Sequence, residues 1–323
     1  MSTLKISRVK SKRWLLIFLL MTINFVSSIA IVMLNKHMYL HREMPPMFLA
    51  GFQFLFTFVG LLFLIAASFF KVKSVSILKV VPLSIAFCSF VVFSNLSLKH
   101  NTIGTYQILK CLADPFTFLL QVIMYGKKYT VNVKLSLLTV LIGIIINYWS
   151  DVVLNVLGTM FGLIAVIACS LYYTWIGTTQ ETLQLDPSQL LFYQSSISAL
   201  LLLAISVTIE YPELYSYFDK FDSIEMIYLT VSGLLALLVS TSVFYIINQT
   251  SVITYAVFCK LKICAVLVVG YVIFSEAMVI GQMVGVIITL IGTFSYTAAK
   301  LSEQGKSRSR LAGYSPTSSN QKN

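Results

Sequence analysis

Hydrophobic residues dominate the chain in long runs that short polar segments interrupt. Ten of these runs come close to or exceed the length of about 20 residues that an α-helix needs to cross a lipid bilayer. They lie at residues 14–35, 47–70, 80–98, 103–125, 133–149, 155–177, 189–209, 226–247, 252–274 and 280–299. The pattern predicts an all-α membrane protein of about ten transmembrane helices.

The composition agrees with a chain whose main solvent is lipid. Of the 323 residues, 58% are hydrophobic and 11% are charged, whereas soluble domains contain about 25% charged residues. The first hydrophobic run follows the basic residues of segment 5–13, as it would in a secretory signal peptide. The run is too long for a signal peptide and no small-residue cleavage site follows it, so we expect a retained span.

The basic residues predict how the chain is oriented. With ten spans and a cytosolic N-terminus, sixteen of the 23 lysine and arginine residues fall in cytosolic segments, four lie on the opposite side and three lie inside spans. Because positively charged loops stay in the cytosol, we expect both termini to be cytosolic. Residues 1–13 would form a basic cytosolic N-terminus. Residues 301–323, rich in serine, lysine, arginine and glycine, predict a disordered cytosolic tail.

Two short matches at one separation indicate an internal repeat. Residues 101–106 are similar to residues 250–255, and Leu141–Gly143 is repeated at Leu290–Gly292, in both cases 149 residues later. The chain would then consist of two related units.

The repeat predicts a first five-helix unit over residues 14–149 and a second over residues 150–300. Because each unit contains an odd number of spans, the second unit is inverted in the membrane. Inverted repeats are common in secondary transporters, which bind their substrates where the two units meet.

Three lysines lie inside the predicted spans: Lys110 in the fourth span, and Lys260 and Lys262 in the ninth. A charged side chain at the bilayer centre costs about 2.5–3.5 kcal/mol on insertion scales, which favours a functional role. The alternative is that the long side chains reach the membrane interface. Residues two apart on a helix point roughly 200° apart, so Lys260 and Lys262 should not both face one cavity. One of them could pair with a carboxylate or a backbone carbonyl instead.

Asp114 is the only acidic residue inside a predicted span, one helical turn beyond Lys110. Two interpretations remain open: an ion pair with Lys110 within the helix, and a proton-binding site. Three lysines against one aspartate predict a net positive cavity, which requires an anionic partner. Phosphate is the natural candidate. Pro115 predicts a kink just beyond Lys110 that could open such a cavity.

Polar and aromatic residues of the same spans are candidates for contacting the rest of the ligand. They are Tyr106, Gln107, Tyr193, Gln194 and Tyr255. Aromatic rings can stack on a base and amides can bind its edge, although each tyrosine could instead pack between helices or lie at the membrane interface. Six glycines are expected to allow close helix approach: Gly104, Gly143, Gly158, Gly162, Gly285 and Gly292.

The sequence contains no motif that supports catalysis or a cofactor. The five cysteines lack metal-ligand spacing, and there is no P-loop or nucleophile elbow. We therefore expect no enzymatic activity, no metal site and no nucleic-acid partner. The expected partners are the lipid bilayer and a small anion, with a homodimer left open.

Several segments together resemble the nucleotide-sugar and triose-phosphate transporter family of the drug/metabolite transporter superfamily, over about residues 14–303. They are Leu34-Asn35-Lys36, residues 90–98, residues 101–107 leading to Lys110 and Pro115, residues 191–194, Thr254-Tyr255 with Lys262, residues 270–272 and residues 301–304. The sequence most resembles solute carrier family 35 subfamily E and the plant UDP-sugar transporters.

The resemblance implies ten spans in two inverted five-helix halves and alternating access. It implies exchange of a nucleotide sugar, UDP-linked by the most similar branches, for a nucleoside monophosphate across a Golgi or ER membrane. The family's substrate-binding lysines correspond to Lys110 and Lys262, and the segment that closes the first span adds Asn35 as a candidate.

Two departures from the family pattern affect the choice of substrate. The family's Lys-Thr or Lys-Arg pair of the ninth span is Lys262-Ile263 here, and the Gly-Ala-Leu-Asn-Lys motif of GDP-mannose carriers is absent. GDP-mannose is therefore disfavoured. A carrier of sugar phosphates or other organic phosphates, and a membrane scaffold or receptor without a transport cycle, remain as alternatives.

Overall fold

The computed structural model describes residues 2–150, 155–249, 252–275 and 279–313, and all regular secondary structure in them is helical. The helices are α1 (Ser2–His41), α2 (Pro46–Ala66), α3 (Ile77–His100), α4 (Ile103–Cys111), α5 (Ala113–Tyr125), α6 (Val131–Trp149), α7 (Val156–Leu183), α8 (Pro187–Ile209), α9 (Tyr211–Asp219), α10 (Ser223–Gln249), α11 (Val252–Phe274) and α12 (Ile280–Gly313).

The described helices confirm a multi-pass all-α membrane protein. By length and composition, nine segments of them could cross a membrane, with α4 and α5 counted as one segment. α11, which carries Lys260 and Lys262, occupies the position of the remaining predicted span. Each predicted hydrophobic run therefore corresponds to a helix or to a pair of consecutive helices.

Local sequence signals set several helix ends. The Thr102 hydroxyl accepts a hydrogen bond from the Thr105 N–H and so caps the start of α4. Asp186 and Gln189 form a capping box at the start of α8. Gly126 ends α5 with a φ of +59°, a left-handed conformation that glycine adopts without strain.

Three features differ from the prediction. The fourth span, for which only a kink at Pro115 was predicted, is divided at Leu112 into two helices, α4 and α5. The segment between α8 and α10 folds into the short helix α9, which buries Leu214 and Tyr217. α12 also continues to Gly313, whereas the composition predicts a disordered tail from residue 301. Extending an existing helix is easier than nucleating one, which accounts for helix over residues 301–313. Residues 314–323 lie outside the described part.

The helices pair as a two-fold relation between the halves would require. α3 packs against α7 and α8, and α10 makes the corresponding contacts with α1 and α2. The pairs α2–α8 and α6–α12 join helices in equivalent positions of the two halves. The repeat inferred from sequence stays a prediction, and residues 250–251 of the first matching segment lie outside the described residues.

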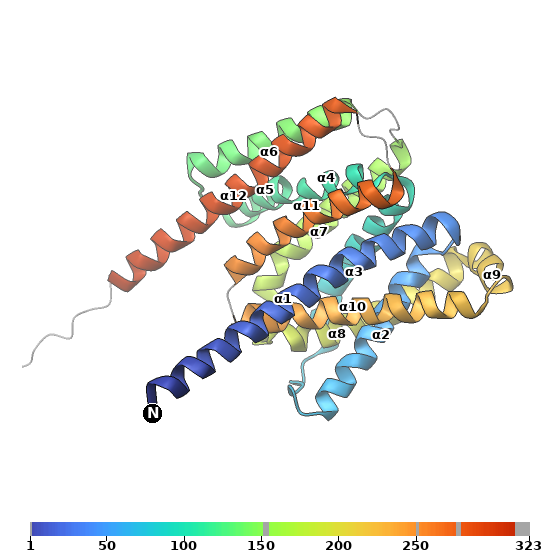
Figure 1. Cartoon of the computed structure of the whole chain (residues 1–323), viewed down its shortest axis with the longest axis horizontal. Coiled ribbons are helices and arrows are strands. Elements are labelled where there is room, and N and C mark those ends of the chain that lie inside the picture. The colour runs from blue at the N-terminus through green and yellow to red at the C-terminus, as the bar shows by residue number, and fades with distance from the viewer. Residues whose placement is uncertain (1, 151–154, 250–251, 276–278, 314–323) are drawn as a thin grey trace, which may run out of the picture.

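Figure 1 shows α6 and α12 side by side along one edge of the bundle. The start of α1 and the end of α12 project from the same end of the molecule, and α9 lies at the opposite end. The two ends of the described part, Ser2 and Gly313, therefore lie at the same end of the molecule.

The backbones of α6 and α12 touch because glycines face the partner helix. A Cβ atom at Gly143 would lie 2.4 Å from the Thr289 nitrogen, and one at Gly285 would lie 2.4 Å from the Asn147 nitrogen. No larger side chain fits at these positions without moving a helix. The expected close approach at Gly143 and Gly285 is thus present.

Polar contacts tie the helices together at the end that carries α9. Arg42, directly after α1, forms an ion pair with Glu225 of α10 at 3.2 Å. The Lys36 ammonium donates a hydrogen bond of 2.9 Å to the Leu98 carbonyl near the end of α3. The Glu210 carboxylate accepts hydrogen bonds from the Met47 and Phe48 N–H groups in the first turn of α2, at 2.9 and 3.0 Å.

Candidate substrate-binding cavity

A cavity of about 380 Å³ lies inside the bundle, between α1, α3, α4, α5, α7, α10 and α11. Its wall is built from both halves of the chain. The volume falls within the range of about 300–1,000 Å³ that is typical of small-molecule sites.

The break between α4 and α5 lies in the wall of this cavity. The Leu112 N–H bonds to the Leu109 carbonyl, three residues back, at 3.0 Å. Pro115 has no N–H with which to continue the helical pattern, in agreement with the kink predicted there. The break places Lys110 in the last turn of α4 and Asp114 in the first turn of α5, where their charges complement the helix dipoles.

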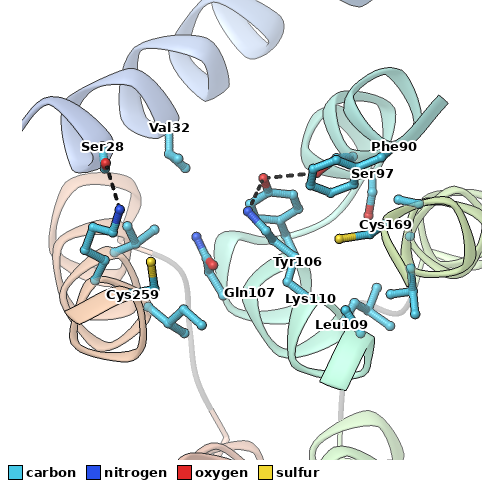
Figure 2. A pocket seen from close by; sticks show the side chains of 18 of the residues that line it. Ser28, Val32, Phe90, Ser97, Tyr106, Gln107, Leu109, Lys110, Cys169 and Cys259 are labelled. Atoms are coloured by element: carbon cyan, nitrogen blue, oxygen red, sulfur yellow. Dashed lines mark hydrogen bonds between the residues drawn. The ribbon is translucent and has the colours of Figure 1, made fainter. Parts of the chain in front are cut away.

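Lys110 lines the cavity from the first half and interacts with an aromatic neighbour. Its ammonium donates a hydrogen bond of 3.2 Å to the Tyr106 hydroxyl and lies 4.9 Å from the centre of the Tyr106 ring. The Tyr106 hydroxyl is also 3.3 Å from the Ser94 hydroxyl of α3. Figure 2 shows Lys110 and Tyr106 on the opposite side of the cavity from Ser28 and Cys259.

Lys262 faces the same cavity from the second half. Its ammonium donates hydrogen bonds to Asn24 Oδ1 at 2.9 Å, to Ser28 Oγ at 3.4 Å and to the Tyr255 hydroxyl at 3.4 Å. It also lies 5.2 Å from the centre of the Tyr255 ring. All of these groups are neutral, so they hold the ammonium without cancelling its charge.

Lys260 forms an ion pair with Asp114. Its ammonium lies 2.7 Å from Asp114 Oδ2, which joins α11 to α5 across the two halves. The interpretation of Asp114 as an intrahelical partner of Lys110 is therefore wrong. The divergence of Lys260 and Lys262 agrees with their separation by two residues, one pairing with a carboxylate while the other faces neutral groups.

The cavity lining carries an excess of positive charge, as the sequence predicts. Its charged side chains are Lys110, Lys260, Lys262 and Asp114. Since Lys260 pairs with Asp114, the other two lysines remain. Among the ion pairs of the described residues, none includes Lys110 or Lys262.

The structure brings six of the nine candidate residues together around this cavity. They are Tyr106, Gln107, Lys110, Tyr255, Lys260 and Lys262. Gln107 projects into the space between α4 and α11 (Figure 2). Its amide is placed to contact a ligand that lies between the two halves.

The other three candidates lie outside the cavity lining, and each has a neighbour in the protein. The Tyr193 hydroxyl donates to the Lys73 carbonyl at 2.9 Å, and Gln194 Oε1 accepts from the Tyr172 hydroxyl at 3.4 Å. Asn35 Oδ1 accepts from Gln53 Nε2 at 3.0 Å. These three side chains bond to other parts of the protein, while the buried Gln194 Nε2 has no hydrogen-bond partner among the described residues.

Asn24 and Ser28 are site residues that the sequence reasoning missed. Both lie on α1 and hold Lys262. Asn24 is fully buried in an apolar run, and a buried amide in a membrane span is itself a signal of a polar partner.

One end of the cavity is closed by packed apolar side chains. Tyr106 and Val266 line the cavity and also belong to a buried cluster with Met38, Met44 and Leu98. Since this cluster joins the α1, α2, α3, α4 and α11 segments at the end that carries α9, the cavity is closed toward that end.

Within the described residues, no group of histidine, cysteine or acidic side chains could hold a metal ion.

Known proteins are similar to this chain in sequence and in fold. The model of the Triose-phosphate Transporter family matches residues 15–297. A solved protein crystal structure has a TM-score of 0.53 and 13% identity, and the match covers 86% of this chain and 98% of that one. At that identity, the likeness concerns the fold alone.

Similar sequences include named transporters. UDP-xylose transporter 1 of Arabidopsis thaliana is 28% identical over 298 residues, covering 90% of this chain and 87% of the relative. GDP-fucose transporter 1 of Dictyostelium discoideum is 26% identical over 300 residues, covering 87% and 80%. UDP-rhamnose/UDP-galactose transporter 1 of Arabidopsis thaliana is 28% identical over 298 residues, covering 90% and 85%. Because the family match extends over most of its length, the chain belongs to the Triose-phosphate Transporter family.

Proposed function

We propose that this protein is a secondary antiporter that exchanges a nucleotide sugar, UDP-linked, for a nucleoside monophosphate across a Golgi or ER membrane. The observation that carries the proposal is the pair Lys110 and Lys262. The two ammonium groups come from opposite halves, line one cavity and have neutral hydrogen-bond partners. A cavity with excess positive charge inside a membrane is best neutralised by an anionic ligand.

The rest of the cavity suits the organic parts of such a ligand. Tyr106 and Tyr255 provide aromatic rings beside the two lysines, and Gln107 provides an amide that can pair with a base edge. The named relatives transport UDP-xylose, UDP-rhamnose, UDP-galactose or GDP-fucose, which supports a nucleotide sugar over a simple sugar phosphate.

The closed end of the cavity supports a place for this conformation in the proposed transport cycle. With both termini in the cytosol, the apolar cluster around Met38 and Leu98 lies on the lumenal side of the cavity. The conformation is then closed to the lumen. Alternating access requires that this cluster separates when the cavity opens on the lumenal side.

The test is exchange by purified protein in liposomes loaded with UMP, with labelled UDP-sugars supplied outside. Lys110→Ala or Lys262→Ala should each lower exchange about 10- to 100-fold, because a charge-assisted hydrogen bond contributes about 1.5–3 kcal/mol and 1.4 kcal/mol corresponds to a factor of ten. Arginine at either position should restore exchange only in part, since its planar fork differs from an ammonium in shape. Lys134→Ala, at the exposed start of α6, is the matched control and should exchange as the wild type does.

The same assay separates the alternatives. Uptake of sugar phosphates but not of nucleotide sugars would favour an organic-phosphate carrier. Normal exchange by both alanine variants would refute the role of the two lysines. Absence of uptake and of any ligand-induced thermal stabilisation for nucleotide sugars and sugar phosphates alike would favour a scaffold or receptor.

A further inference from the structure

The Lys260–Asp114 ion pair forms part of the cavity wall and bridges the two halves. The two atoms are 2.7 Å apart, and the side chains are 16% and 23% exposed. The pair therefore remains in contact with the cavity, where its charges act on any ligand. Among the described residues that line the cavity, Asp114 is also the only one with a carboxylate.

The partner of Asp114 determines which lysines of the cavity remain without a neutralising carboxylate. Lys110 lies one helical turn from Asp114, a spacing at which opposite charges often pair. Asp114 instead contacts Lys260, and Lys110 contacts the neutral Tyr106 hydroxyl. As a result, the two unneutralised lysines come from α4 and α11 and line the same cavity.

We propose that Asp114 is a specificity-determining residue that sets the charge of the cavity. By neutralising Lys260, it leaves two cationic groups, so that the cavity favours ligands whose phosphates carry two negative charges. The inference rests on the proposed function, in that it explains how one cavity accepts both exchanged substrates.

The two proposed substrates share this charge. A nucleotide sugar has one ionised oxygen on each of its two bridging phosphates. The phosphate ester of a nucleoside monophosphate carries about −1.5 to −2 charges at pH 7. A nucleoside diphosphate adds a terminal phosphate group with a further ionisation, and a triphosphate adds more. In a site with little water, excess ligand charge that no cation balances is costly.

The experiment removes the charge of Asp114 and measures which ligands bind. Affinities of UMP, UDP and UTP are measured by thermal shift on the purified full chain, together with inorganic phosphate and pyrophosphate, which lack base and sugar. Asp114→Asn frees Lys260, and the affinity for UDP relative to UMP should rise about tenfold, equivalent to about 1.4 kcal/mol. The ratio for pyrophosphate relative to phosphate should rise in parallel.

Two further variants separate charge from structure. The double variant Asp114→Asn/Lys260→Gln lacks the ion pair but keeps two cationic groups, so its ligand ratios should return to those of the wild type. Lys260→Gln alone leaves Asp114 unpaired and should shift the ratios in the opposite direction, toward UMP. Glu213→Gln breaks the exposed Lys99–Glu213 ion pair outside the cavity and should leave the ratios unchanged.

The outcomes decide the proposal. Equal ratios in the wild type, Asp114→Asn and Lys260→Gln would overturn it, as would the same shift in Asp114→Asn and in the double variant, because the ion pair would then act only on structure. If Asp114→Asn fails to fold, Lys260→Gln still tests the proposal, because its affinity ratio of UDP to UMP should fall. The protein could bind no uridine compound and still show the expected change in the ratio of pyrophosphate to phosphate affinity. That result would support the role of Asp114 in setting the cavity charge and would refute the UDP-sugar function.

Discussion

Asn24 Oδ1 accepts a hydrogen bond of 2.9 Å from the Lys262 ammonium, which ties α1 to α11 in the wall of the cavity. The Asn24 amide nitrogen donates to the Val239 carbonyl at 3.2 Å and to Ser242 Oγ at 2.8 Å on α10. These two bonds fix the amide so that its oxygen points at the lysine. Asn24 therefore orients Lys262 while leaving its charge available to a ligand.

A carboxylate in place of this amide should inactivate the cavity. Asn24→Asp keeps the size of the side chain but places a negative charge beside Lys262, and the resulting ion pair would compete with the substrate phosphate. We expect affinity for a nucleotide sugar to fall about 10- to 100-fold. The check is a titration of UDP-sugars by thermal shift.

Asn35→Asp provides the control for this prediction. Asn35 is also a buried asparagine of α1, but it contacts Gln53 and Ser232 outside the cavity lining. This variant should lower the melting temperature, because it buries a charge, without changing ligand affinity. Equal loss of affinity in both variants would show that the effect on Asn24 is not specific to Lys262.

Glu210 should make stability depend on pH. Burial raises the pKa of this carboxyl above its usual value of 4.5, and the hydrogen bonds from the Met47 and Phe48 N–H groups oppose that rise only in part. A carboxyl whose pKa is raised by folding stabilises the folded state fully below its unfolded pKa. That contribution is lost as the pH rises through the folded pKa.

The comparison of wild type with Glu210→Gln isolates this effect, because glutamine does not titrate. Between pH 4.5 and the folded pKa above it, the melting temperature of the wild type should decline relative to that of the variant. The measurement is thermal unfolding in detergent over a series of pH values. A parallel pH dependence in the two proteins would assign the titration to another group.

The glycine contact between α6 and α12 should be sensitive to a single methyl group. Gly285→Ala places a Cβ atom 2.4 Å from the Asn147 nitrogen, and backbone atoms cannot move aside as a side chain can. We expect a destabilisation of about 1–3 kcal/mol, the usual cost of overpacking. Thermal unfolding of the purified variant is the measurement.

Gly177→Ala is the matched control in a helix of the same protein. A Cβ atom at Gly177 has no neighbour within 4 Å, so alanine there should be neutral or should stabilise by about 0.4–1 kcal/mol through the unfolded state. If both alanines destabilise equally, helix-interior glycine has a role in this fold other than close packing.

The sequence was sufficient to predict the membrane helices because burial in lipid acts on every residue of a span. Hydrophobic length alone located the membrane-crossing part of each helix, but not how far α1 extends before residue 14 or α12 beyond residue 299. The three lysines inside the spans were equally visible, since a charge in an apolar run is costly wherever the helix lies. These signals depend only on the local segment and need no knowledge of its neighbours.

The partners of those charges could not be predicted in the same way. Spacing along α4 and α5 suggests Lys110 as the partner of Asp114, yet Lys260, distant in sequence, forms the ion pair. The roles of Tyr193 and Gln194 also depended on which face of α8 meets a neighbouring helix. Such contacts follow from how the two halves pack, and a single sequence does not specify that packing.

The break at Leu112 has a consequence for the empty protein. A carrier made of two identical inverted halves would have the same free energy whichever side of the membrane it faced, because a two-fold rotation in the membrane plane would convert one orientation into the other. Here α4 and α5 are interrupted, while their counterpart α11 is continuous from Val252 to Phe274. The two halves differ in structure, so the conformations open to opposite sides of the membrane differ in free energy. These two conformations should therefore be unequally populated in the protein without substrate. A preference for one side is then built into the chain before any substrate gradient acts on it.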